Sequence, residues 1–155
     1  MADDATISIS ATLLPDEISR VISGSMTVSP DDANDKWYYK LTAVTTTSAD
    51  LIAGAFLDYT AVDQDTAPTA ITTSDKVKFL FVQVQSSTDG IYLGFAGETA
   101  VNSLANGVFV GPLQTWFGRL PNTVVSSLHA IAADLGSTGD TTANVIVAAL
   151  IEDVA

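Results

Sequence analysis

A regular alternation of apolar and polar residues constrains the fold of this chain more than any other feature. It runs through three early segments, 5–14, 20–28 and 36–46. Successive side chains of a β-strand point to opposite faces of a sheet, so a period of two predicts strands with one buried and one wet face. Prolines and polar residues separate the segments, as at Pro15 and Pro30, and these positions predict the turns.

Two later segments, 77–85 and 144–151, are apolar on both faces of the expected strand. A strand of an antiparallel sheet usually keeps one face in water. Apolar residues on both faces therefore predict that another sheet, a loop or a neighbouring subunit covers the second face. After the first segment, Asp89-Gly90 predicts a hairpin turn into a strand that begins at Ile91, because glycine tolerates the positive φ of a tight turn.

Two segments fit either a helix or a strand. Segment 49–59 could begin with a helical turn capped by Asp50, and segment 124–135 has apolar residues at helical spacing. A strand is favoured for the second, because its valines and serines suit a sheet. With further short strands at 107–111 and 115–117, the chain holds about eight to ten strands and no long helix.

This pattern predicts an all-β fold, an antiparallel β-sandwich of the jelly-roll kind. We expect residues 15–155 to form the single sandwich domain. We expect residues 1–14 to form an extended N-terminal arm or an edge strand.

For its 155 residues the chain has few side chains that could act as nucleophiles, acid–base groups or metal ligands. It has one histidine, no cysteine and 15% charged residues, while 33 positions are Ser or Thr. The missing cysteines exclude disulfides, thiolate nucleophiles and thiolate metal ligands. We therefore expect no enzyme, and accordingly no catalytic residues, no cofactor and no metal site.

One set of residues has the side-chain types of a Ser-His-Asp nucleophilic triad: Ser127, His129 and either Asp134 or Asp140. A triad is defined by geometry, and no serine here lies in the motif that exposes a nucleophile on a sharp turn. We therefore expect a hydrogen-bonded histidine without a catalytic role.

The acidic loop 31–35 (DDAND) is a second candidate, because calcium prefers carboxylate ligands. The loop lacks the ligand spacing and the distal glutamate of an EF-hand. A solvated loop is expected, and a divalent cation site is the alternative. The glycines fit no phosphate-binding loop, because the chain has no G-x-x-x-x-G-K-[ST] motif.

Acidic residues outnumber basic ones by 18 to 6, and the formal net charge is −12. Nucleic acids and anionic membranes are bound through cationic patches, so neither is an expected partner. No apolar run reaches the roughly 18 residues that span a bilayer. The first residues also lack the basic and apolar segments of a secretory signal, so we expect a soluble protein that is synthesised in the cytoplasm.

Charge is unevenly distributed along the chain. Residues 79–155 contain six acidic residues and one basic residue, Arg119. The surface of a soluble monomer normally carries more charged groups than this half of the chain can supply. This half is therefore expected to supply the core, an oligomer interface or both.

The segment around this arginine, 111–121 (GPLQTWFGRLP), is the most distinctive of the chain. Arginine and aromatic residues anchor many protein interfaces. The alternatives are core packing, a salt bridge within the subunit and, for these aromatics and those of segment 37–39 (WYY), stacking on a sugar ring. The interface candidates are Ile7 and Ile9 of the arm together with Trp116, Phe117, Arg119 and Leu120.

Four stretches carry a resemblance: MADDATISISATLLPDEIS at the start, and later DGIYLGFAG, GPLQTWFGRLPN and ANVIVAALIEDV. In these the chain resembles a structural protein of a tailed-bacteriophage virion, most of all a capsid decoration (cement) protein. The resemblance implies a β-sandwich subunit, made in the host cytoplasm and added in many copies to the capsid surface. It also implies a homo-dimer or homo-trimer that bridges major capsid protein subunits and has no catalytic residues.

In such an assembly the subunits would associate through the low-charge second half. Residues 2–14 would pair with a neighbour by β-augmentation. Each added subunit would then clamp adjacent capsid proteins and stabilise the shell. The alternatives are a tail-fibre or receptor-binding head and a carbohydrate-binding β-sandwich module, both of which would present aromatic residues to a glycan.

Overall fold

The computed structural model describes residues 4–13, 20–57, 69–95, 97, 107–133 and 142–154. The chain divides into two compact units, Met1–Ala33 and Asn34–Ala155. The sequence predicts a boundary after residue 14, with the strand Arg20–Val28 in the larger domain. The structure instead has that strand in the smaller unit, because it pairs along its whole length with the strand before it.

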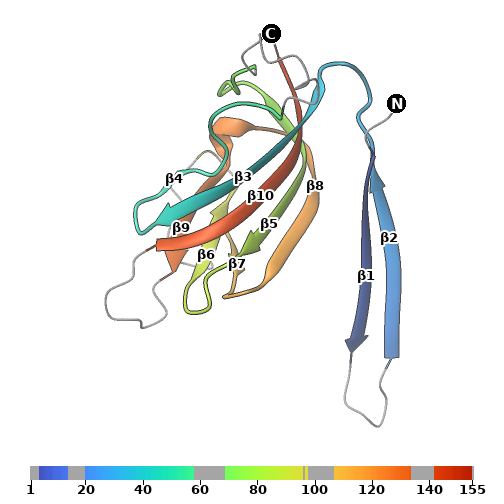
Figure 1. Ribbon diagram of the computed structural model, residues 1–155, viewed down its shortest axis with the longest axis vertical. Coiled ribbons are helices and arrows are strands. Elements are labelled where there is room, and N and C mark those ends of the chain that lie inside the picture. The colour runs from blue at the N-terminus through green and yellow to red at the C-terminus, as the bar shows by residue number, and fades with distance from the viewer. Residues whose placement is uncertain are drawn as a thin grey trace. The chain divides into compact units, whose positions relative to one another are not determined.

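The smaller unit is an antiparallel hairpin of two strands, β1 (Ala5–Leu13) and β2 (Arg20–Val28) (Figure 1). Directly paired residues lie on the same face of such a hairpin. One face carries serine and threonine apart from Val21: Thr6, Ser8, Ser10, Thr12, Ser23, Ser25 and Thr27. The other face ends at the charged residue Arg20, and we call its apolar members the hairpin apolar face: Ala5, Ile7, Ile9, Ala11, Ile22, Gly24, Met26 and Val28.

The described residues of the larger unit form eight strands in two four-stranded antiparallel sheets (Figure 1). The long-stranded sheet has the order β3 (Asp35–Thr45), β10 (Thr142–Glu152), β5 (Lys76–Val84) and β8 (Thr115–Val124). The short-stranded sheet has the order β4 (Ala49–Asp50), β9 (His129–Ala133), β6 (Gly90–Gly94) and β7 (Val108–Val110). A 3₁₀ turn, η2 (Val125–Ser127), is the only helical element among the described residues.

The strands of the larger unit pair as nested partners. β3 pairs with β10, β4 with β9, β5 with β8, and β6 with β7. The chain from β3 to β10 therefore pairs as one long hairpin would, with β6 and β7 at its tip. Two further pairings, β10 with β5 and β9 with β6, join these partners into the two sheets.

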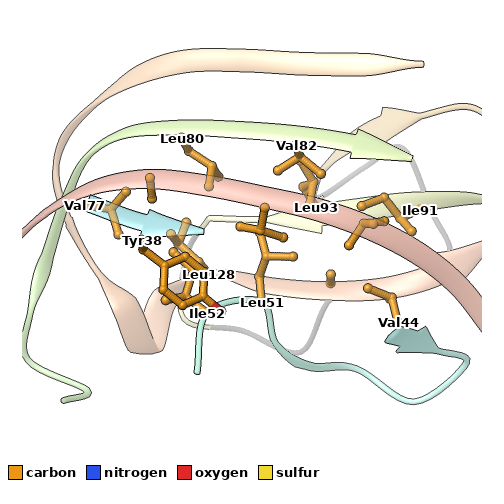
Figure 2. Close-up of a cluster of buried hydrophobic side chains, with 14 of the residues drawn as sticks. Tyr38, Val44, Leu51, Ile52, Val77, Leu80, Val82, Ile91, Leu93 and Leu128 are labelled. Carbon is orange, nitrogen blue, oxygen red and sulfur yellow. The ribbon is translucent and has the colours of Figure 1, made fainter. Parts of the chain in front are cut away.

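Side chains from both sheets meet in one hydrophobic core, which Figure 2 shows. Removing this apolar area from water is the main force that holds the layers together, at about 25 cal/mol per Å². The all-β, antiparallel class predicted from the sequence is confirmed, and the two layers share a core as in a β-sandwich. The largest fully buried members of this core are Tyr38, Leu51, Ile52, Leu80, Ile91, Leu93, Leu128 and Ile151.

The hairpin predicted at Asp89-Gly90 is wrong. β5 pairs with β10 and β8, whereas β6 pairs with β7 and β9, so the chain crosses from one sheet to the other at this point. Gly90 is required for a different reason. A Cβ atom there would lie 2.6 Å from the carbonyl oxygen of Val110 and 2.7 Å from the ring of Phe109, on the neighbouring strand β7.

The two ambiguous segments contain no α-helix within the described residues. Between residues 124 and 133 the chain runs from the end of β8 through η2 into β9, so the favoured strand is confirmed apart from one 3₁₀ turn. Residues 134 and 135 lie outside the described residues. Segment 49–57 holds the two-residue strand β4 and then Leu51 and Ile52, which pack into the core.

Candidate interaction surface

The long-stranded sheet has an apolar outer face as well as an apolar inner one. In β10 every second residue from Val145 to Ile151 lies in the core. The residues between them, Ile146, Ala148 and Leu150, therefore point away from the core, because successive side chains of a strand alternate between faces.

The neighbouring strand β5 repeats this arrangement. Leu80 and Val82 are core residues, so Phe79 and Phe81 point to the outer face. Phe79 is buried although it does not belong to the core between the sheets. The apolar residues found on both faces of segments 77–85 and 144–151 thus have a structural counterpart: one face packs in the core and the other forms the outside of the sheet.

The strand register aligns these residues across all four strands. The central row runs through Tyr39, Ala148, Phe81 and Phe117. The rows beside it run through Trp37, Leu150, Phe79 and Arg119, and through Leu41, Ile146, Gln83 and Thr115. We call the apolar members of these rows the outer apolar face: Trp37, Tyr39, Leu41, Phe79, Phe81, Phe117, Ile146, Ala148 and Leu150.

The outer apolar face is most open at the edge strand β3. Tyr39 is 55% exposed and Leu41 is 60% exposed, although both side chains are large and apolar in the main. A contiguous apolar patch with a polar border is typical of a protein–protein or ligand contact rather than of a free surface. This face is therefore the strongest candidate for an interaction surface in the larger unit.

Charged residues border one end of this face. The Lys78 ammonium lies 2.8 Å from a carboxylate oxygen of Asp35 and 3.9 Å from Glu152. The Asp35 side chain has no exposed area, whereas that of Lys78 is 20% exposed. Lys36, on β3, forms a separate ion pair with Asp153, which directly follows β10. The acidic and basic groups here neutralise each other, which leaves the adjoining rows to apolar contact.

The structure separates the interface candidates of segment 111–121. Trp116 and Leu120 pack against the core, and the Trp116 ring lies 5.4 Å from the Phe95 ring, centroid to centroid. Phe117 pairs with Phe81 on the outer apolar face, and Arg119 pairs with Phe79 in the next row. Alternation along β8 explains the division, because Trp116 and Phe117 are adjacent and so point to opposite faces.

The two candidates of the N-terminal arm lie together on the hairpin apolar face. Ile7 is half-buried and Ile9 is 44% exposed. Ile22, which pairs with Ala11 on the same face, is 58% exposed. β1 pairs with β2 of its own chain, so both strands present this face together.

The aromatic segment 37–39 is also divided between faces. Tyr38 is fully buried in the core, and its hydroxyl donates a hydrogen bond of 3.2 Å to the carbonyl oxygen of Ala53. Burial raises the pKa of Tyr38, while the hydrogen bond with Ala53 acts in the opposite direction. Trp37 and Tyr39 lie on the outer apolar face, where Tyr39 is open to a ligand.

The histidine does not pair with the neighbouring serine. The Nε2 atom of His129 lies 3.1 Å from the backbone carbonyl oxygen of Ser126, and its Nδ1 atom lies 3.7 Å from the Asp50 carboxylate. These contacts fix the ring against the chain and provide no serine nucleophile. The two other carboxylates of the expected set, Asp134 and Asp140, lie outside the described residues.

The acidic loop 31–35 does not converge on a common point. Asp31 and Asp32 are exposed, whereas Asp35 is buried in contact with Lys78. No group of three or more residues suited to hold a metal ion occurs in the part of the chain that the structure describes. The same part contains no helix of the length and apolar character that crossing a membrane requires.

The sequence indicated a second apolar face on segments 77–85 and 144–151, but it did not show which residues of other strands join it. Leu41, Phe81, Ile146 and Ala148 are ordinary strand residues that no motif marks, and only the register brings them together. The signal in the sequence was that segments 77–85 and 144–151 carry apolar residues on both faces of the expected strands. No protein-family model, no curated protein and no solved structure matches this chain.

Proposed function

We propose that this protein is a non-enzymatic structural component of a virion that binds the outer surface of the capsid as a homo-oligomer. In this role it stabilises the shell by bridging subunits of the major capsid protein. The observation that carries the proposal is the outer apolar face, because a subunit of an assembly requires a surface of this kind and a free monomer does not.

The strand order supports a finer description of the fold, a jelly roll. A jelly roll is an eight-stranded sandwich of two sheets whose strands pair as a long hairpin folded over on itself. The nested pairing of β3 with β10 down to β6 with β7 has this form. Jelly rolls occur in viral capsid proteins and in lectins, so this order favours both the virion role and its main alternative.

Low charge on the surfaces involved also supports an assembly role. The three rows that cross the long-stranded sheet contain one charged residue, Arg119. Burying such a surface against another protein removes few strongly hydrated groups from water. The cost of desolvation on assembly is therefore low.

The test is binding of the purified protein to capsids assembled from the major capsid protein of the virus that encodes this chain. We expect co-sedimentation at a fixed stoichiometry and a higher melting temperature of the shell. Leu41→Asp on the outer apolar face should reduce binding. Leu113→Asp is the matched control, because Leu113 is 64% exposed outside the three rows of that face. Wild-type protein that never co-sediments with such capsids would exclude the proposal.

Glycan binding is the second candidate function, and one observation favours it. In the central row the small residue Ala148 lies between Tyr39 and Phe81. Two aromatic side chains therefore border a short one on the outer apolar face. Apolar faces of sugars stack on such rings. Binding on a glycan array that Tyr39→Ala abolishes, without binding to capsids, would select this alternative.

A further inference from the structure

We propose that the hairpin apolar face of one copy covers the outer apolar face of a second copy, and that two copies exchange their hairpins reciprocally. The proposal deepens the homo-oligomeric part of the proposed function and rests on it. It does not depend on a capsid. Each copy supplies one face of each kind, so a reciprocal exchange satisfies both in a closed dimer.

The hairpin requires a surface to cover its apolar side. An isolated two-stranded hairpin is marginally stable in water, and a third strand or a packed face is needed to hold it. Here isoleucine and methionine lie on one face, which ends at the charged residue Arg20, and Ser or Thr lie on the other apart from Val21. Such a division indicates one covered face and one wet face.

The dimensions of the two faces agree. Nine-residue strands extend about 30 Å, and two strands side by side are about 10 Å wide. One hairpin face therefore covers roughly 300 Å², an area similar to that of three rows across a four-stranded sheet. Two exchanged hairpins, counted with the surfaces that they cover, bury about 1,200 Å², the lower end of the range for stable interfaces.

The short connection between the units is compatible with an exchange of hairpins between copies. Residues 29–34 (SPDDAN) join β2 to β3, which is the open edge of the outer apolar face. Pro30 fixes its own φ and holds Ser29 extended, and a bend and a turn follow at residues 32–34. Asp31 and Asp32 are exposed. Short connections of this kind promote the exchange of elements between copies.

The absence of cysteine makes a direct test possible. Packed sheets lie about 10 Å apart, which is too far for a disulfide but matches a short bis-maleimide. One preparation carries Ile22→Cys on the hairpin apolar face, and the other carries Leu41→Cys on the outer apolar face. After mixing, a cross-link between positions 22 and 41 joins two different chains by construction.

Matched controls distinguish the faces. Val21 is 68% exposed and adjacent to Ile22, but lies on the Ser/Thr face. Val21→Cys should cross-link to position 41 at least roughly tenfold less than Ile22→Cys, since only one face is buried. Leu113→Cys replaces Leu41→Cys as the control on the larger unit, because Leu113 is exposed away from the outer apolar face.

Solution mass gives a second, independent readout. We expect a dimer whose dissociation constant rises roughly tenfold or more with Ile22→Asp, because burial of one isoleucine side chain accounts for such a factor. Val21→Asp should leave the constant nearly unchanged. Higher salt should strengthen the dimer, because it screens the repulsion between two copies of charge −12.

Three results would overturn the proposal: a monomer at all concentrations, equal cross-linking from positions 21 and 22, or a link that forms only when both cysteines are in one chain. The last result would show that the hairpin covers its own sheet. A cross-linked dimer that does not bind capsids would leave this inference standing and exclude the proposed function. Capsid binding by a monomer would overturn this inference and the homo-oligomeric part of the proposed function, and would leave capsid binding itself standing.

Discussion

Tyr38 is the clearest case of a residue whose role depends on a single polar group in the core. Its hydroxyl donates to the Ala53 carbonyl oxygen at 3.2 Å and lies 3.4 Å from the Ala53 nitrogen, while the ring fills space between the sheets. The fold therefore favours the protonated phenol, and burial raises its pKa. The neighbouring aromatic residues Trp37 and Tyr39 lie on the outer apolar face instead of in this core.

We expect Tyr38→Phe to lower the free energy of unfolding by about 1 kcal/mol at neutral pH, because a buried carbonyl and amide lose their partner. The pKa of Tyr38 is higher in the folded than in the unfolded protein, so its contribution is complete below pH ~10 and is lost as pH rises further. Urea denaturation at pH 8 to 11 should show the wild type losing this advantage over Tyr38→Phe. A constant difference across the range would contradict the expectation.

Lys78 is the cation that compensates a carboxylate buried at the start of β3. We expect Lys78→Met to destabilise the protein by about 2–4 kcal/mol, because it leaves Asp35 buried without its ammonium partner. Lys76→Met, two residues away on the same strand, is the control and should cost less than about 1 kcal/mol. Addition of Asp35→Asn to Lys78→Met should recover part of the loss. Thermal melts of the four proteins test this.

At the scale of elements, strand pairing depends on close approach at a few glycines. A Cβ atom at Gly107, which precedes β7, would lie 2.2 Å from the backbone oxygen of Leu93 on β6. A backbone atom cannot move aside as the end of a side chain can. Gly24 on β2 differs, because a Cβ atom there meets nothing within 4 Å.

We therefore expect Gly107→Ala to separate β6 from β7 and to lower the stability of the larger unit by more than about 2 kcal/mol. Gly24→Ala should leave the melting temperature unchanged or raise it slightly, since alanine restricts the unfolded chain. Calorimetry of both variants measures the difference. A Gly107→Ala protein as stable as the wild type would mean that this strand pair tolerates a wider spacing.

At the scale of the whole molecule, the two compact units predict separable stability. Val28 of the hairpin is buried, but the core cluster between the two sheets comes entirely from the larger unit. We expect residues 34–155 alone to fold and to melt cooperatively within a few degrees of the full chain. Circular dichroism on heating tests this, and loss of the cooperative transition would show that the hairpin is part of the fold.

Truncation at the unit boundary is also a better probe of the arm than a shorter deletion that removes β1 alone. That shorter deletion would leave β2 without its partner β1 and would expose an unpaired strand edge. Removal of residues 1–33 leaves no such edge, so a loss of dimerisation or of capsid binding reports on the hairpin itself.

The sequence by itself determined the secondary-structure class and most strand positions, because side-chain alternation follows directly from strand geometry. It also indicated, through the residues 77–85 and 144–151, that some surface beyond the core is apolar. It could not determine that Asp89-Gly90 joins two sheets, that Arg20–Val28 pairs with β1, or that Trp116 and Phe117 separate. Those outcomes depend on which strands pair and in which register, and pairing is set by contacts between residues far apart in the chain. Only the tertiary structure brings Tyr39, Phe81 and Phe117 into one row, because each lies on a different strand and no local pattern links them.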